Sequence, residues 1–414
     1  MKQEKIIVLL LASINFTHIL DFMIMMPLGN YLMPYFHISP RQFSFLVAAY
    51  TFSAAGSGFL AAFFVDRYDR KKILLLGYIG FLLGTYACGF APTYELLLAA
   101  RTLAGIFGGL IGAQVLSIIS DLFGYERRGA AMGAVMSSFA IASTIGVPLA
   151  LYLANIFSWH APFIFVGLLG TVIVFLVVKF IPKSTSHISE RDENSHRMQA
   201  LLDVIKNPGQ ILTLVFSCLV MMGHFLIIPF INPFLEFNKG FSKSLTPIIY
   251  LVGGIASFIS ALALGKFSDK VGKLKVFTWS VMFSFFMVWI ITNMPVIPFF
   301  IVLLLFAAWF TVATGRAVTA QAMISNMAQT EQRGSFMSFN GCVQQLGTGM
   351  ASVIAGFVVI KNSAGKLERY NWVGYISIVV LLSGLLLAQY LFKKMDKRVV
   401  IELPQKLQST LEER

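Results

Sequence analysis

Charged residues are scarce in this 414-residue chain, and their scarcity excludes a water-soluble globular protein. A soluble domain carries roughly 25% charged residues, whereas this chain has 12%. Hydrophobic residues make up 57% of the chain, and the mean hydropathy is +0.77. The composition therefore indicates an integral membrane protein.

Cysteines and catalytic motifs are also scarce. Cys88, Cys218 and Cys342 all lie in apolar runs, where they favour neither a disulfide framework nor a zinc site, so we expect no metal and no cofactor. The phosphate-binding pattern G-x-x-x-x-G-K-[ST] is missing, which argues against ATP as the energy source. Neither a nucleophile elbow nor paired acids indicate catalysis. We expect a protein that is not an enzyme, with an intramembrane enzyme as an alternative.

Long apolar runs divide the chain into segments that can cross a membrane, which takes about 20 helical residues for a hydrocarbon core of ~30 Å. Continuous runs predict helices, because barrel strands would alternate polar and apolar residues. We expect an all-α integral membrane protein with 12 transmembrane helices. The runs lie near 6–33, 43–65, 73–91, 95–120, 130–157, 161–181, 210–235, 246–268, 274–293, 297–324, 335–360 and 371–392.

Two short charged motifs occur twice, about half a chain apart. Residues 66–71 (DRYDRK) are matched by residues 269–273 (DKVGK), at an offset of 203 (269 − 66). Residues 126–132 (ERRGAAM) are matched by residues 331–337 (EQRGSFM), at an offset of 205 (331 − 126). Two nearly equal offsets imply a duplicated unit of about 200 residues. The chain is therefore predicted to consist of two similar halves.

The duplication and the apolar runs together define the expected domains. We expect six-helix bundles at 1–181 and 209–392, a cytoplasmic linker at 182–208 and a cytoplasmic tail at 393–414. Of the 32 lysines and arginines, 24 fall beside the spans on one side of the membrane. Positive residues stay inside, so both termini are predicted to be cytoplasmic. A basic face of this kind meets anionic membrane lipid, and we expect no nucleic-acid partner.

The repeated loop motif points to a known family. Its second copy, from Gly265 to Lys273, fits G-x-x-x-D-[RK]-x-G-[RK] completely, and the first copy has Ala62 and Asp69 in the two glycine places. With its two parallel six-helix repeats, the chain resembles the major facilitator superfamily, in particular the twelve-span drug:proton antiporter and sugar-efflux branch. The resemblance covers essentially the whole chain. It implies that fold, a small-molecule substrate, coupling to protons and a monomer in the bacterial cytoplasmic (inner) membrane.

Charged residues of the repeated motif form a candidate cytoplasmic gate. An acid at the end of one helix and a base at the start of the next can pair with each other and with neighbouring helix ends. Such a cluster can hold one conformation closed and release it in the other. The alternative is that these residues only anchor the topology. The candidates are Asp66, Arg67, Arg70, Asp269 and Lys273.

Asp21 is the one carboxylate deep within a predicted span. A charged side chain at the bilayer centre costs about 2.5–3.5 kcal/mol, so we expect Asp21 to face a cavity or a partner. His18, one turn away, could share or relay its proton. In proteins that this chain resembles, an acid spaced as Asp21 is from Pro27 is a common proton or substrate-cation site. The alternatives are a core histidine and a static ion pair of Asp21 with Arg101 or Arg316.

Two arginines within spans and one asparagine complete the expected central site. Arg101, followed by Gly105, resembles the R-x-x-x-G signature of the family's fourth span, and its guanidinium could modulate the proton affinity of a nearby acid. Arg316 lies in the corresponding span of the second half. It would suit an anionic or polyhydroxylated substrate, or a charge partner for Asp21. Asn232 is a candidate polar group of the substrate pocket.

The fifth span retains little of the antiporter signature G-x-x-x-G-P-x-x-G-G. Gly146 and Pro148 still predict a kinked helix. We expect secondary active transport, with proton-coupled efflux of small amphipathic compounds or sugar-like metabolites. Because the signature is poorly kept, proton-coupled uptake stays an alternative, and so does a receptor of transporter fold that binds without transporting. Substrate identity and stoichiometry are not predicted.

Overall fold

The computed structural model describes residues 2–64, 68–182, 206–327 and 333–412. Within these ranges, 12 helical spans are long and apolar enough to cross a membrane, which confirms the predicted number. The predicted all-α class is also confirmed, since the fold is nearly all helical. The β structure within these ranges is one small antiparallel hairpin of β1 (Ile360–Lys361) and β2 (Leu367–Glu368).

The first half supplies six spans and one short helix. The fifth span is continuous from α6 through a π-helical segment, η2, into α7. The elements are α1 (Lys2–Met25), α2 (Gly29–Tyr35), α3 (Pro40–Phe64), α4 (Arg70–Gly89), α5 (Tyr94–Leu122), α6 (Tyr125–Ile141), η2 (Ala142–Gly146), α7 (Val147–Ile156) and α8 (Ala161–Phe180).

The second half repeats this plan, and its first span is again broken near one end. The elements are α10 (Pro208–Phe225), α11 (Ile228–Pro233), η4 (Phe234–Asn238), η5 (Lys243–Leu245), α12 (Thr246–Val271), α13 (Lys273–Asn293), α14 (Phe299–Ser325), α15 (Arg333–Val358) and α16 (Tyr370–Glu412). Most of the expected linker, residues 183–205, lies outside the described residues.

Two element boundaries differ from the expected runs. The first run was expected to continue to residue 33, but α1 ends at Met25 and α2 begins at Gly29. Pro27 lies between them, and a proline lacks the backbone N–H of a helix and crowds the preceding turn. The last helix, in contrast, continues beyond the expected end of its span at residue 392, as far as Glu412. Residues 393–412 of the expected tail are thus helical.

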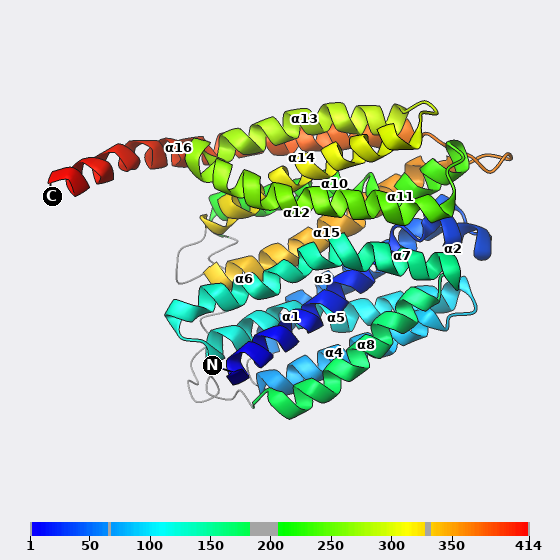
Figure 1. The fold of residues 1–414 in the computed structure, drawn as a ribbon, viewed down its shortest axis with the longest axis horizontal. Coiled ribbons are helices and arrows are strands. Elements are labelled where there is room, and N and C mark those ends of the chain that lie inside the picture. The colour runs from blue at the N-terminus through cyan, green and yellow to red at the C-terminus, as the bar shows by residue number, and fades with distance from the viewer. Residues whose placement is uncertain (1, 65–67, 183–205, 328–332, 413–414) are drawn as a thin grey trace.

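The two halves meet along two seams. In Figure 1 the first half lies below the second, α3 packs along α15, and α12 packs along η2 and α7. The second seam is tight at Gly254, where an added Cβ would lie 2.4 Å from the Cα of Thr144. Glycine therefore allows the two backbones to approach each other.

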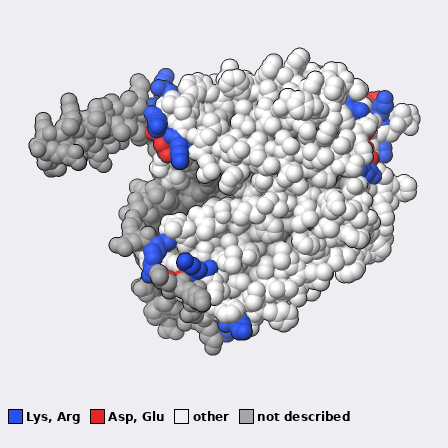
Figure 2. Space-filling view, viewed as in Figure 1, with Lys and Arg blue, Asp and Glu red and all other residues white. Residues whose placement is uncertain are grey.

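The two ends of the bundle differ in how the halves meet. Both chain termini lie at the left in Figure 1, which we call the terminal end, and the β-hairpin marks the opposite, hairpin end. At the hairpin end, Asn30 donates from Nδ2 to Glu236 Oε2 of the other half at 2.6 Å. At the terminal end, the surface in Figure 2 is hollowed between the halves. This conformation is therefore closed at the hairpin end and open towards the terminal end.

Candidate functional site

The centre of the first half is a buried ion pair. Asp21 on α1 forms an ion pair with Arg101 on α5, with 2.7 Å between Oδ2 and Nη1. Both side chains are at most 1% exposed. The hydroxyl of Thr85 on α4 donates to the other carboxylate oxygen at 3.1 Å. Three helices thus converge on one carboxylate. Of the two arginines considered as partners from the sequence, the structure selects Arg101.

Close packing of α3 against α5 positions this arginine. An added Cβ at Gly105 would lie 2.4 Å from the carbonyl oxygen of Tyr50, and one at Gly109 would lie 2.3 Å from that of Ala54. Because both positions are glycine, α3 approaches closely enough for the Tyr50 ring to lie under Arg101, 4.4 Å from the guanidinium carbon. A cation over an aromatic face is stabilised by the ring quadrupole. This contact explains the R-x-x-x-G pattern seen in the sequence.

His18 lies beside the pair without bonding to it. Its ring contacts Phe81 at 5.5 Å and Tyr50 at 6.3 Å between centroids. Neither ring nitrogen has a hydrogen-bond partner among the described residues. An added Cβ at Gly108 would lie 3.1 Å from Nε2, so this glycine leaves room for the ring. The proton relay proposed for His18 and Asp21 is not formed in this conformation.

The second half has a different centre at the equivalent position. His224 follows Asp21 by 203 residues (224 − 21), the same offset as the repeated loop motif. Arg316 Nη2 lies 3.3 Å from Nδ1 of His224, and the ring of His224 stacks on Trp309 with centroids 5.3 Å apart. Arg316 is 2% exposed, and its Nη1 has no partner among the described residues. An imidazole thus stands where the first half has a carboxylate.

A single aromatic contact joins the two centres. Phe22 follows Asp21 on α1, and Phe225 follows His224 on α10. Their ring centroids lie 5.9 Å apart across the boundary between the halves. Phe22 also stacks on Tyr50, with centroids 5.8 Å apart. Phe22 and Phe225 thus form a chain of ring contacts between the two centres in this conformation.

Asn232 and the predicted kink lie at the contacts between the halves. Asn232 donates from Nδ2 to the carbonyl oxygen of Pro27 at 2.9 Å, so it belongs to the closed hairpin end rather than to either arginine centre. At the predicted kink, the chain forms the π-helical segment η2, which ends at Gly146, and Pro148 is the second residue of α7. Pro148 has no N–H to continue the hydrogen-bond ladder of this continuous span, and the π-helical turn directly before it lies where that ladder is interrupted. This segment packs against α12.

The candidate gate residues pair within their own halves where the structure describes them. Arg70 forms an ion pair with Asp121 and donates to the carbonyl oxygen of Ser117 at 2.9 Å. Lys273 pairs with Asp269 at 3.2 Å, one helical turn away. Asp66 and Arg67 lie outside the described residues.

Several partners of the site were not identified from the sequence. Three of them lie on neighbouring helices, namely Thr85, Tyr50 and Asp121. Each is a common residue type and is not part of a recognisable motif. His224 did carry a signal, since the offset of the repeat places it opposite Asp21. Applying that offset residue by residue would have found it.

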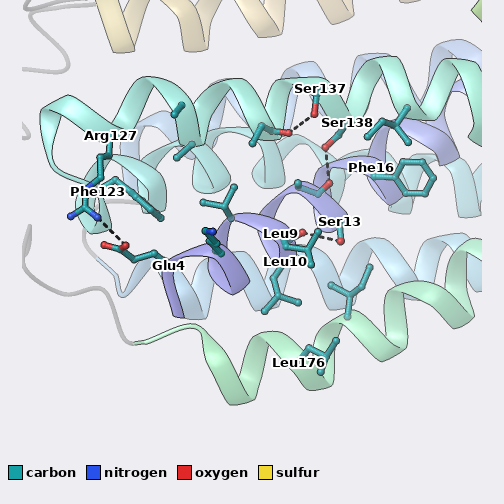
Figure 3. Close-up of a pocket in the computed structure, with 18 of the residues that line it drawn as sticks. Glu4, Leu9, Leu10, Ser13, Phe16, Phe123, Arg127, Ser137, Ser138 and Leu176 are labelled. Carbon is teal, nitrogen blue, oxygen red and sulfur yellow. Dashed lines mark hydrogen bonds and ion pairs between the residues drawn. The ribbon is translucent and has the colours of Figure 1, made fainter. Parts of the chain in front are cut away.

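A separate cavity of about 1010 Å³ lies within the first half, between α1, α6 and α8 (Figure 3). Its walls are largely apolar. The hydroxyl of Ser138 donates a hydrogen bond to the carbonyl oxygen of Ala12 at 2.8 Å. Glu4 and Arg127 form an ion pair of 3.0 Å at one end of it. None of the predicted site residues lines this cavity. It is therefore distinct from the two arginine centres.

Comparison with known proteins agrees with the architecture. The family model of the Major Facilitator Superfamily matches residues 11–318 and 219–411. An uncharacterised MFS-type transporter of Bacillus subtilis, YceJ, is 24% identical over 84% of this chain and 88% of its own. Multidrug resistance protein 2 of the same organism is 25% identical over 87% of this chain and 90% of its own.

A solved structure has the same fold. It is a bacterial homologue of the human lysosomal transporter Spinster, described as inward-facing and unoccupied, with a TM-score of 0.75, 16% identity and coverage of 94% of this chain and 98% of the other. The family match extends over nearly the whole chain, and the described part supplies the twelve spans of that fold. The chain therefore belongs to the major facilitator superfamily and is a membrane transporter of that type.

Proposed function

We propose that the protein is a proton-coupled secondary transporter of the bacterial inner membrane that exports small amphipathic compounds or sugar-like metabolites by alternating access. The observation that carries this proposal is the ion pair of Asp21 and Arg101, sealed from solvent inside the first half. A membrane protein that keeps a carboxylate at this depth uses it, as a rule, for ion or proton movement.

The pair offers a simple coupling step. When a proton binds Asp21, Arg101 loses its counter-charge, and breaking one partner of a buried pair typically costs about 3–5 kcal/mol. Protonation therefore destabilises the packed arrangement of α1, α4 and α5 that holds the pair in this conformation. A conformation in which water reaches Arg101 then becomes more favourable in free energy relative to the packed one. The proton thus shifts the population between two states of the transporter.

The difference between the two ends supports alternating access. The halves are bonded to each other at the hairpin end through Asn30 and Glu236, and the surface is hollowed between them at the terminal end. With both termini in the cytoplasm, this state faces inward. In the opposite state, the hairpin-end bonds break and the terminal end closes. Arg70, Asp269 and Lys273 would then exchange their present partners for bonds between the halves.

Direction is the least constrained part of the proposal. Similarity to multidrug resistance protein 2 over most of both chains supports export. The poorly kept signature around Gly146 and Pro148 weakens the indication of export, so proton-coupled uptake stays the second candidate. In both cases the same carboxylate carries the proton, and only the order of binding and release differs.

Vesicle experiments test coupling and direction together. Inside-out membrane vesicles containing the protein are energised, and lumenal pH is followed while candidate compounds are added. Antiport predicts lumenal alkalinisation on addition of a substrate, because the substrate enters as protons leave. Vesicles with Asp21→Asn are the matched control and should give no pH response. A substrate-dependent signal of equal size in the control would remove Asp21 from the coupling step.

A further inference from the structure

We infer that Arg316, His224 and Trp309 form a binding site for a negatively charged group, and that the transported compound is an anion with a flat apolar part, such as an aromatic carboxylate. This inference rests on the proposed transport function and specifies its substrate class. Its starting point is the imbalance of charge at the centre of the second half.

Arg316 is a buried cation with no ion pair to a described residue. It is 2% exposed, and its Nη1 has no hydrogen-bond partner among the described residues. A guanidinium is always charged and carries five donors in a rigid fork. Among the described residues, its side-chain hydrogen-bond partner is the Nδ1 atom of His224 at 3.3 Å. Burying such a charge without a partner is costly, so the site favours an anion that supplies the missing charge.

The carboxylates described in the second half are engaged elsewhere. Glu236 bonds Asn30 at the hairpin end, Asp269 pairs with Lys273, and Glu368 accepts from Asn362 at 2.9 Å. In the first half, Asp21 already pairs with Arg101. These four described carboxylates are all bonded to groups other than Arg316, so in the proposed site a ligand supplies its counter-ion.

Aromatic faces provide the apolar part of the site. Trp309 and Arg316 are seven residues apart on α14, so they lie on the same face of the helix, two turns apart. Trp309 stacks on His224 at an interplanar angle of 29°, and His224 also contacts Phe225 edge-on at 5.2 Å. A planar ring carried by the anion would suit this aromatic surrounding, while its carboxylate faces the guanidinium.

A line of polar groups leads from the terminal end towards Arg316. Ser217 lies two turns from His224 on the same face of α10. It accepts a hydrogen bond from Gln344 Nε2 at 3.2 Å, and the same nitrogen lies 3.3 Å from Gln321 Oε1. Gln321 is exposed and lies one and a half turns beyond Arg316 on α14. An anion entering from the hollow at the terminal end thus meets hydrogen-bonding groups before it reaches the buried cation.

The test uses purified full-length protein in detergent and measures thermal unfolding. The probes are acetate, benzoate and indole-3-acetate, each compared with its uncharged amide of nearly the same shape. A ligand that binds the folded state raises the midpoint temperature. We expect the two aromatic carboxylates to raise it by a few degrees, acetate to raise it less, and the amides to leave it unchanged.

Two variants separate a binding site from a structural cation. His224→Asp gives Arg316 a protein counter-charge, so it should raise the midpoint temperature of the unliganded protein and abolish the response to carboxylates. Arg316→Gln removes the cation and should abolish the same response. Asp21→Asn, which acts on the other centre, should still respond to the carboxylates even though it no longer couples to protons.

The outcomes distinguish this inference from the proposed function. Equal responses to acids and amides, or a carboxylate response that survives both His224→Asp and Arg316→Gln, would overturn the anion site and leave proton-coupled transport intact. A wild-type protein that responds to carboxylates but moves no solute in vesicles would overturn the transport proposal instead, with the anion site retained.

Discussion

The two halves of this transporter share a helical plan but differ in the partner that each provides for its buried arginine. In the first half, Arg101 is neutralised by Asp21 and steadied by the ring of Tyr50. In the second half, Arg316 meets an imidazole and keeps an unpartnered nitrogen. The repeat offset of 203 residues places the carboxylate of one half opposite the imidazole of the other.

This difference suggests that duplication separated two tasks that would conflict in a single centre. A carboxylate paired with an arginine can exchange that partner for a proton, whereas an unpaired arginine attracts an anion. If both centres carried the pair, the substrate anion would have to compete with a resident carboxylate. The contact of Phe22 with Phe225 lies between the two centres. Four predictions can break or sharpen this comparison.

Removing the charge of Asp21 should have the largest effect. Asp21→Asn leaves Arg101 buried without a counter-charge, at a cost of about 3–5 kcal/mol of folding stability. Proton-driven accumulation should be lost, as measured by substrate uptake into vesicles under an imposed pH gradient. The double variant Asp21→Asn/Arg101→Gln should regain most of the stability without regaining coupling. Uphill transport at the wild-type rate in either variant would contradict the assignment.

Adding a methyl group beside each arginine should affect the first half more than the second. In Gly105→Ala the new Cβ would lie 2.4 Å from the backbone oxygen of Tyr50, which cannot move without shifting α3. In Gly315→Ala it would meet side-chain atoms of Leu264 and Ser280, each at 2.7 Å, which can rotate away. Overpacking costs about 1–3 kcal/mol, so we expect Gly105→Ala near the top of this range and Gly315→Ala near the bottom.

Thermal unfolding of the two alanine variants in detergent gives this comparison directly. A similar loss in both would indicate that the helices around the two arginines are packed equally tightly. A larger loss in Gly315→Ala would reverse the expected order.

A smaller effect is expected from the hydroxyl that bonds Asp21. Thr85→Ala removes a hydrogen bond to a charged carboxylate and should cost about 1.5 kcal/mol. The matched control is Thr319→Ala, whose hydroxyl bonds the backbone of its own helix at Gly315 and should cost less. Thr85→Ala should also shift the pH dependence of transport, because it acts on the carboxylate that is proposed to carry the proton. An unchanged pH profile would argue that Thr85 has only a packing role.

The smallest effect is expected from a variant at the hairpin end of the bundle, away from the two arginine centres. Asn30→Ala removes a hydrogen bond between the halves at the hairpin end. A loss of about 1 kcal/mol changes the population ratio of the two conformations by roughly fivefold. The readout is the rate of thiol labelling at Met26→Cys, in a background without the native cysteines. Arg127→Gln, which breaks an exposed pair with Glu4 within the first half, should leave this rate unchanged. Equal rates in both variants and the parent would show that Asn30 does not hold this end closed.

The fold was predictable because its signals are local. The twelve apolar runs and the repeated loop motif can be read without knowing which helices touch, and the structure confirms the spans. Pro27 was also a local signal, but the helix break that it causes between Met25 and Gly29 was not predicted from it. The site was less predictable. Asp21 and its two possible arginine partners were evident, but the choice between them depends on which helix packs against α1.

By itself, the sequence determined that this chain resides in a membrane, how many times it crosses and that its halves are repeats, because hydrophobic length and motif spacing are properties of the chain. Tertiary structure decided that Asp21 pairs with Arg101 and that Arg316 is left with His224. These pairings depend on side chains brought together from helices distant in sequence, through close contacts such as those at Gly105. Electrostatic energy depends on these distances, so charge alone could not assign the partners.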